Sequence, residues 1–456
     1  MAEPESPPVA PDPDPTEVMA NRRFAMLLVF VAIVGVITSV VAWCFLELVH
    51  QIQVGVFTDL PKDLGYDSGA PNWWYLVVLG IAGLITAFAI VRLPGNGGHT
   101  PAYGLSTERL GPEALPGVIL AALASIGLGA VVGPEAPLIA LGGGLGVLAA
   151  RRLQKDAPQQ MVDIVAASAT FAAVSFLFGS PLIASIILIE AIGIGGPRLK
   201  IVLVPGLMAA GIGSLVSLGM GSWTGLNTSD IAIGALPLPE FARPDLTDFL
   251  WTIPVAIAIA VLMFAIFAVA RPLVEVVQRR RFVLTATGGL VIAGAAIAFS
   301  EITDHPVSDV LFSGQDQVGG LVSQATEYSV GALIALLAFK GLAYSVSLAA
   351  FRGGPIFPAI FLGAAAGLAA AQLPGFETTP AVAVGIGAAT AATLRLPLSA
   401  VTLALLLTSQ SGLGSGPLII IGVTVAYLTV LALSRRFDAA PTDSSGTGDA
   451  SAPAAA

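Results

Sequence analysis

One motif occurs twice in this 456-residue chain, and the repetition constrains the fold more than any other feature. Residues 133–150 read GPEAPLIALGGGLGVLAA. Residues 354–371, which follow 221 positions later, read GPIFPAIFLGAAAGLAAA and match the first copy at nine of eighteen positions without a gap. Each copy opens with Gly-Pro-x-x-Pro and continues into an apolar, glycine-rich segment that predicts a helix. One such helix start in each half is typical of repeated membrane proteins whose site lies between the halves.

These two helix starts predict an anion site. The first N–H groups of a helix have no partner within the helix, and the positive end of the helix dipole lies there, so anions bind at this end. Ile356 and Phe357 would offer such main-chain N–H groups. The first copy has Glu135 where the second has Ile356, and its carboxylate would take the place of an anion until protonation releases it. The alternatives are a solvated loop glutamate and a plain Gly/Pro turn.

Composition and run length predict a membrane protein. The chain is 55% hydrophobic and 11% charged, with a mean hydropathy of +0.88, whereas soluble domains carry about 25% charged residues. A helix needs about 20 residues to span a bilayer. Shorter apolar runs, such as 138–150 and 357–371, predict half-helices that face protein or an aqueous cavity. We expect an all-α polytopic membrane protein, an inverted-repeat bundle of tilted and partly broken transmembrane helices.

The charges predict the domain limits and the orientation. A transmembrane domain over 23–437, with repeat halves at about 24–218 and 249–434, lies between disordered tails at 1–22 and 438–456. The connections 51–72, 219–248 and 301–327 hold only Lys62 and Arg243 against many carboxylates, and the other Lys and Arg residues mark the opposite side. By the positive-inside rule these connections are external and both termini are cytoplasmic. The protein is then multi-pass in the plasma (inner) membrane.

Three further features of the sequence predict a structural or functional role less specifically. Gly98 and His99 lie in a Gly-rich stretch after Arg92, where they would bind an anion from inside; a plain loop is the alternative. Glu190 ends the apolar run 181–189 and would line an internal vestibule or relay protons, unless it pairs with Arg198 at a water interface. The pairs Gly142/Gly146 and Gly363/Gly367 have GxxxG spacing and predict helix packing rather than a ligand site.

Several function classes are excluded. Cys44 is the single cysteine, so no disulfide can form within the chain. The three histidines have no metal-ligand spacing, and no basic face for nucleic acid is present. An intramembrane enzyme needs a nucleophile–base pair or a metal, and His99 is the sole plausible base near a Gly-rich loop. We therefore expect no catalytic residue, no metal and no cofactor. A cation-coupled solute carrier would need intramembrane carboxylates, but besides Glu135 only Glu47 and Glu190 lie near apolar runs.

The motifs resemble those of the CLC chloride channel and transporter family. Residues 133–137, Gly-Pro-Glu-Ala-Pro, are similar to the family's Gly-Arg-Glu-Gly-Pro, and residues 354–358, Gly-Pro-Ile-Phe-Pro, to its Gly-x-Phe-x-Pro. Residues 395–399, Arg-Leu-Pro-Leu-Ser, resemble its Arg-Ala-Pro-Leu-Thr, and the stretch ending at Pro101 lies where it has Gly-Ser-Gly-Ile-Pro. Order and spacing agree over about residues 24 to 434.

The resemblance implies roles for individual residues. Glu135 corresponds to the external gating glutamate, Ile356 and Phe357 to main-chain chloride ligands, and Gly98 to the chloride-coordinating serine. The sequence departs from the family at Pro134, where the family has arginine, and at Gly98, which has no hydroxyl. The family's proton-relay glutamate falls on Ala191, one residue after Glu190, and the late pore tyrosine has no match.

The resemblance also implies the function. We expect chloride or another small anion to cross the bilayer through a glutamate-gated, voltage-gated pathway in each subunit of a homodimer. The departure at Ala191 favours a channel-like or weakly proton-coupled mechanism. The alternatives are a proton-coupled chloride/fluoride antiporter and, less favoured, a cation-coupled solute carrier.

Overall fold

The computed structural model describes residues 19–67, 69–106, 110–192, 197–225 and 234–437. In these ranges the chain is helical, and its one β-type contact is an isolated bridge between Gly133 and Gly354. Nine helices in the described ranges are long and apolar enough to cross a membrane. The all-α polytopic prediction is therefore confirmed. The predicted tail 438–456 and most of the tail 1–22 lie outside the described residues.

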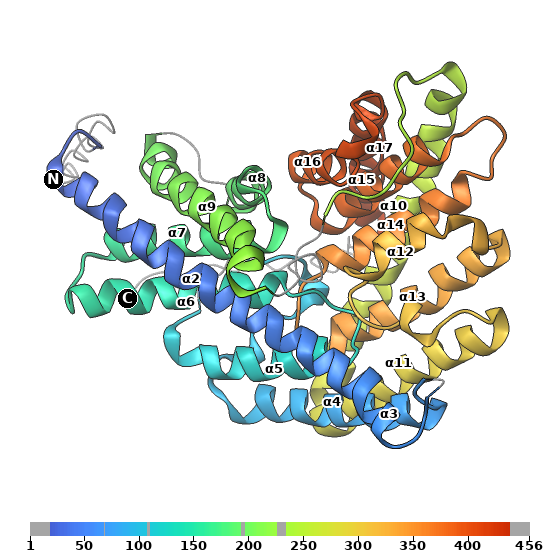
Figure 1. Ribbon diagram of the computed structural model, residues 1–456, viewed down its shortest axis with the longest axis horizontal. Helices are drawn as coiled ribbons and strands as arrows, with labels where there is room; N and C mark the ends of the chain where they lie inside the picture. The colour runs from blue at the N-terminus through green and yellow to red at the C-terminus, as the bar shows by residue number, and fades with distance from the viewer. Residues whose placement is uncertain (1–18, 68, 107–109, 193–196, 226–233, 438–456) are drawn as a thin grey trace, which may run out of the picture.

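The helices fall into two halves (Figure 1). In each half, the helix that begins at the Gly-Pro motif is followed by a longer helix, a short helix and a final long helix. The first half comprises α2 (Arg22–Val54), α3 (Leu60–Asp63), α4 (Asn72–Arg92), α5 (Leu115–Gly127), α6 (Glu135–Leu153), α7 (Gln159–Phe178), α8 (Pro181–Ile192) and α9 (Pro197–Thr224). The second comprises α10 (Leu246–Arg279), α11 (Arg281–Thr303), α12 (Gln317–Ser323), α13 (Val330–Ala350), α14 (Ile356–Ala370), α15 (Thr378–Leu394), α16 (Pro397–Leu407) and α17 (Gly416–Phe437).

Two helices are longer than the apolar runs indicated. The first apolar run covers residues 24–49, but α2 continues to Val54 and passes through a π-helical turn at Gly55–Asp59 into α3. Helix α10 extends from Leu246 to Arg279 with two prolines inside it. A helix rises about 1.5 Å per residue, so both exceed the roughly 30 Å hydrocarbon core. Their polar ends therefore extend past the apolar part of the span.

The GxxxG pairs pack helix against helix, as predicted. A Cβ built on Gly146 would lie 2.5 Å from Cα of Ala166, so α6 and α7 approach each other with almost no space between their backbones. In the second half, a Cβ on Gly367 would lie 2.5 Å from the carbonyl oxygen of Ala381, which gives α14 and α15 the same close contact. Small residues allow such approach in membrane helices. These contacts hold each motif helix against its successor.

Replacing Gly146 by alanine is expected to destabilise the protein by about 1–3 kcal/mol, the usual effect of inserting a methyl group into a tightly packed site. Gly143 on the same helix is a matched control, because the nearest atom to its added Cβ would be 3.6 Å away. The Gly143→Ala variant should be neutral or slightly stabilising, since alanine favours a helix over glycine. Thermal unfolding in detergent checks both. Equal unfolding temperatures would contradict the packing role of Gly146.

Candidate functional site

The two Gly-Pro motifs meet at the centre of the molecule. Gly133 donates its N–H to the carbonyl oxygen of Gly354 at 2.8 Å, and Gly354 donates its N–H to the carbonyl oxygen of Gly133 at 2.6 Å. This antiparallel bridge places the N-terminus of α6 directly beside the N-terminus of α14. The sequence prediction that the repeated helix starts come together where the halves meet is confirmed.

One serine from each half braces the bridge, and the two serines are 222 positions apart in the sequence. The Val131 N–H donates to Oγ of Ser347 at 3.0 Å, and the Arg352 N–H donates to Oγ of Ser125 at 3.1 Å. Each serine hydroxyl also donates to the carbonyl oxygen four residues earlier in its own helix. Val131 and Arg352 are 221 positions apart, the same offset as the motifs. The repeat therefore includes these hydrogen bonds. In each case the serine of one half accepts a hydrogen bond from the main chain of the other half.

Glu135 is the first residue of α6, and its side chain is 1% exposed. Its Oε1 accepts a hydrogen bond of 2.8 Å from the main-chain N–H of Phe357, and the Ile356 N–H interacts with the same carboxylate. The other oxygen, Oε2, has no hydrogen-bond partner in the described parts of the chain. A Cβ at Gly133 or Gly354 would collide with this carboxylate. Glycine is required at both positions so that the carboxylate can lie over the start of α14.

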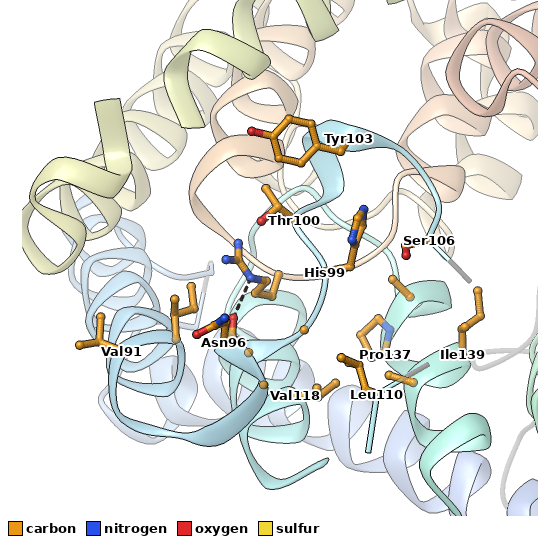
Figure 2. A pocket seen from close by; sticks show the side chains of 18 of the residues that line it. Val91, Asn96, His99, Thr100, Tyr103, Ser106, Leu110, Val118, Pro137 and Ile139 are labelled. Atoms are coloured by element: carbon orange, nitrogen blue, oxygen red, sulfur yellow. Dashed lines mark hydrogen bonds between the residues drawn. The ribbon is translucent and has the colours of Figure 1, made fainter. Parts of the chain in front are cut away.

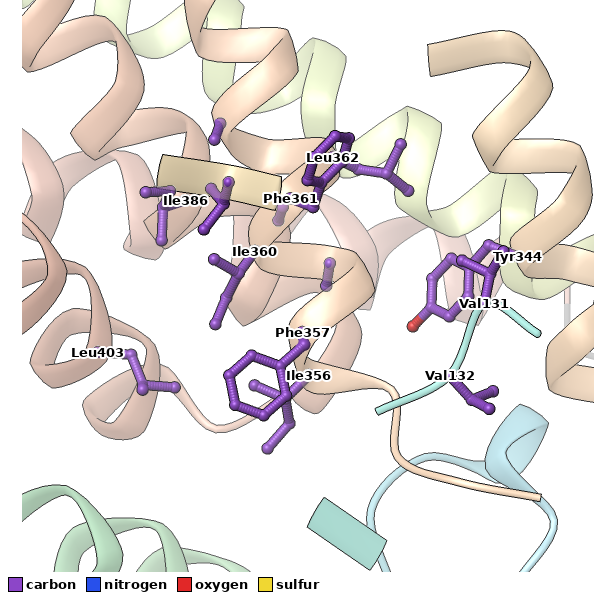
Figure 3. Packing of buried hydrophobic residues seen from close by; sticks show 14 of the residues in the cluster. Val131, Val132, Tyr344, Ile356, Phe357, Ile360, Phe361, Leu362, Ile386 and Leu403 are labelled. Carbon is purple, nitrogen blue, oxygen red and sulfur yellow. The ribbon is translucent and has the colours of Figure 1, made fainter. Parts of the chain in front are cut away.

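The residues at the start of α14 that donate to Glu135 have apolar side chains, so they donate only through their main-chain N–H groups. Ile356 and Phe357 begin α14 and are each 1% exposed (Figure 3). The Phe357 ring stacks on Phe178, at the end of α7, with ring centroids 5.6 Å apart. Tyr344 on α13 donates its O–H to the carbonyl oxygen of Pro355 at 2.7 Å and so fixes the turn that precedes the helix. The arrangement offers N–H groups to an anion with no cationic side chain at the contact.

Gly98 and His99 line a cavity of about 660 Å³ that also reaches Ala136 and Pro137 in the first turn of α6 (Figure 2). The stretch is therefore next to the site, as predicted. Anion binding by Gly98 stays a prediction, and its N–H already donates to the carbonyl oxygen of Gly95 at 2.8 Å. That bond closes a tight turn in which Gly98 has φ of +96°, a conformation that favours glycine. The N–H is thus engaged by the turn.

Glu190 caps another helix. Its carboxylate accepts hydrogen bonds from the N–H groups of Leu398 and Ser399, at 3.0 and 2.7 Å, and from the Ser399 hydroxyl at 2.6 Å. These donors form the start of α16, where a carboxylate stabilises free N–H groups and the helix dipole. Glu190 does not line the cavity that holds Gly98 and His99. A role as proton relay stays a prediction, and any such role has to accommodate three hydrogen bonds to α16.

Lys340 was overlooked in the sequence although it interrupts an apolar run. It is 0% exposed on α13, and its Nζ donates to four carbonyl oxygens, those of Asp309, Val310, Leu311 and Phe312, at 2.8 to 3.4 Å. The Nζ also lies 4.2 Å from the ring centroid of Phe361 on α14, within the range of a cation–π interaction. Burial raises the pKa of the nearby Asp309 carboxyl, against the lowering effects of the Tyr328 hydrogen bond and the Lys340 charge. Lys340 fixes the loop before α12 against the motif helix α14.

A family model described as voltage gated chloride channel matches residues 101–431. An Escherichia fergusonii protein that carries a provisional ion-transport name, YfeO, is 30% identical over 353 residues, which cover 76% of this chain and 80% of that protein. Proteins of the same name from Escherichia coli match equally well.

Solved structures share the fold. A slow cyanobacterial Cl⁻/H⁺ antiporter superposes with a TM-score of 0.72 at 20% identity, covering 89% of this chain and 94% of the other. A CLC-type fluoride/proton antiporter gives a TM-score of 0.63 at 16% identity, covering 89% and 95%. A eukaryotic CLC transporter gives 0.65 at 16% identity, covering 90% and 72%.

Proposed function

The chain belongs to the voltage-gated chloride channel family, whose members move anions across membranes, and we propose that it conducts chloride through a pathway gated by Glu135. The observation that carries the proposal is the 2.8 Å hydrogen bond between the Phe357 N–H and the Glu135 carboxylate. A carboxylate is itself an anion, so a group that binds it at a helix start has the chemistry to bind chloride.

The proposed cycle follows from competition for these donors. While Glu135 is ionised, its carboxylate occupies the N–H groups of Ile356 and Phe357 and blocks the pathway. Protonation removes the charge, weakens the contact and lets a chloride ion take the same donors. Main-chain N–H groups attract an anion without a fixed positive charge, and this allows the ion to leave again. Anion flux should therefore rise as the pH falls.

We further propose a homodimer in the plasma (inner) membrane, with one pathway per subunit and both termini in the cytoplasm. The distribution of Lys and Arg supports the orientation. Large apolar side chains are exposed on α8, α9, α16 and α17, among them Leu182, Leu218 and Leu398, at 68%, 72% and 58%. Such exposed surface is covered either by lipid or by another subunit. Chemical crosslinking in membranes tests the subunit number.

Proton coupling is expected to be weak or absent. A coupled exchanger passes protons between the gating glutamate and the cytoplasm, but Ala191 occupies the family's relay position and cannot titrate. Glu190 lies one residue earlier, about 100° around a helix, and its carboxylate is engaged by α16. In liposomes, a chloride gradient should therefore drive little uphill proton movement. The measurement is chloride, fluoride and nitrate flux with and without a pH gradient.

A proton-coupled chloride or fluoride antiporter is the second candidate. Two solved structures with the same fold, those of a slow Cl⁻/H⁺ antiporter and of a fluoride/proton antiporter, favour it. Robust proton pumping at a fixed anion-to-proton ratio would establish this alternative and refute channel-like transport. Loss of that pumping in Glu190→Gln, with anion flux retained, would then identify Glu190 as the replacement relay.

A further inference from the structure

A second cavity lies where α10 passes the C-terminal ends of α15 and α17. Its volume is about 840 Å³, and its walls come from these three helices and from residues 103–105. The three helices pack directly against one another (Figure 1). This α10–α17 pocket shares Tyr103, and no other described lining residue, with the cavity that holds Gly98 and His99. It is therefore a neighbouring hollow with its own set of walls.

Most of the wall of the α10–α17 pocket is apolar. Met263, Phe267 and Val430 line it with buried side chains. Its rim is apolar as well, since Val269 and Phe437 are 53% and 66% exposed. Both α10 and α17 are long and apolar enough to cross a membrane. A largely apolar hollow of this size with a few polar groups has the usual form of a binding site for an organic ligand.

The charged residues that line the pocket are Arg271 on α10 and Arg395, which caps the C-terminus of α15. None of the described lining residues is acidic. Near the start of α10, Trp251 donates its indole N–H to the carbonyl oxygen of Pro374, just before α15, at 3.0 Å. The two helices therefore begin side by side and run in the same direction, so both arginines lie toward the same end of the pocket.

This basic end is the predicted cytoplasmic end. Arg395 donates from Nη2 to the hydroxyl of Ser434 at 2.6 Å. Ser434 directly precedes Arg435 and Arg436 in the last turn of α17, and the positive-inside rule places such a basic turn in the cytoplasm. A guanidinium has five N–H donors, and a neutral hydroxyl leaves its charge unbalanced. An anion is the ligand that would balance it.

Thr393 supplies a hydroxyl group that lacks a partner. Its side chain lines the pocket and is 6% exposed, and its Oγ1 makes no hydrogen bond within the described chain. A threonine inside a helix commonly donates to the carbonyl oxygen four residues earlier, as Thr252 and Thr408 do here. An unpaired buried hydroxyl is unfavourable. An oxygen atom of a ligand in the pocket would accept this hydrogen bond.

An amphiphile with an anionic head matches this combination of groups. A phosphodiester offers two oxygens to a planar guanidinium, which binds them through parallel hydrogen bonds, and its acyl chains suit the apolar wall. Basic pockets between transmembrane helices on the cytoplasmic side bind anionic lipid headgroups. Residues 438–456, which follow Phe437, include no aromatic and no long aliphatic side chain. They therefore cannot take the place of the acyl chains.

We propose that the α10–α17 pocket binds one anionic phospholipid from the cytoplasmic leaflet. The phosphate lies against Arg395 and Arg271, the Thr393 hydroxyl donates to an oxygen of the phosphate or of the glycerol ester, and an acyl chain lies along Met263 and Phe267. The proposal concerns lipid binding alone, so it holds whether or not the protein conducts chloride.

The test is native mass spectrometry of the full-length protein in detergent with phosphatidylglycerol, which is anionic, and with phosphatidylcholine, which is not. The wild type should bind phosphatidylglycerol more tightly. Arg395→Gln and Arg271→Gln should each weaken that binding about fivefold, the effect of one basic residue beside an anionic lipid. Arg279→Gln is the matched control, because Arg279 is exposed at the end of α10 and does not line the pocket. It should bind the lipid as the wild type does.

A pair of threonine variants separates binding from folding. Thr393→Val should weaken phosphatidylglycerol binding about 2- to 10-fold, the effect of losing one hydrogen bond. It should not lower the unfolding temperature of the lipid-free protein, because the hydroxyl has no partner to lose. Thr390→Val is the control, since Thr390 is 0% exposed on the same helix, has no partner for its hydroxyl among the described residues and does not line the pocket. Its lipid affinity should equal that of the wild type.

A third variant fills the pocket without touching a polar group. Ala268 lines it from an exposed position on α10, so Ala268→Trp should fold and should exclude the acyl chain. Unchanged phosphatidylglycerol affinity in Arg395→Gln, Thr393→Val and Ala268→Trp would overturn the proposal, as would equal affinity of the wild type for the two lipids. Glycerol phosphate, which has the anionic head but no acyl chain, should bind at least 10-fold more weakly. Equal affinity for it would show a site for a small anion rather than for a lipid.

Discussion

Replacing Glu135 by alanine is expected to abolish most of the pH dependence of anion flux. The variant lacks the carboxylate that occupies the Phe357 N–H, so chloride should reach this donor at any pH. Flux at neutral pH should rise to about the level that the wild type reaches in acid, while chloride binding survives. The measurement is chloride efflux from liposomes between pH 4 and 8, with protein incorporation matched between samples.

Glu135→Gln is the control for side-chain volume. Glutamine keeps the size of the protonated glutamate but carries no charge at any pH, so its flux should also be independent of pH. A wild-type pH profile in Glu135→Ala would show that another group gates the pathway. A pH-independent Glu135→Ala beside a pH-dependent Glu135→Gln would show that the side chain acts by size rather than by charge.

Replacing Phe357 by proline is expected to weaken chloride affinity about 10- to 100-fold, whereas Phe357→Ala should weaken it only modestly. Both substitutions remove the ring that stacks on Phe178, but only proline removes the N–H. Phe357 is the second residue of α14, where the helix itself does not use the N–H and proline is tolerated. The difference between the variants therefore isolates one hydrogen bond to an ion, which has an effect of this size.

The measurement is chloride titration in a Glu135→Ala background, where no carboxylate competes for the site. Thermal unfolding shows whether each variant is folded, because Phe357 is 1% exposed and its loss leaves space in the core. Equal chloride affinities in folded Phe357→Pro and Phe357→Ala would contradict coordination by the main chain. The wild-type ring should also matter little for the choice of anion, since it offers no hydrogen-bond donor.

The sequence was sufficient to predict the centre of the site. Nine identities in the repeated motif predicted two facing helix starts, and the difference between Glu135 and Ile356 predicted which half would supply the carboxylate. Both predictions depend on local rules, namely where a helix begins and what its free N–H groups bind. They therefore required no knowledge of distant contacts.

Other parts of the site depend on contacts between distant segments. The turn at Gly95 uses the N–H of Gly98, and a motif alignment cannot show which N–H groups a turn consumes. The Lys340 ammonium binds four carbonyls some 30 residues earlier in the chain. Its presence in the apolar run was visible, but its partners were not. Nothing local in the sequence indicates that Arg352 is buried beside a cavity.

The Gly133–Gly354 bridge limits how this molecule can open. Many repeated transporters alternate by rocking one half against the other around a fixed site. Here such a rotation would shear both bridge hydrogen bonds and both serine braces at once, and it would expose their donors in a dry interior. The two helix starts should therefore move together as one rigid unit. In the proposed function, opening requires only the rotation of the Glu135 side chain, which is a small and fast motion, so the rate of passage should depend little on the fluidity of the surrounding lipid.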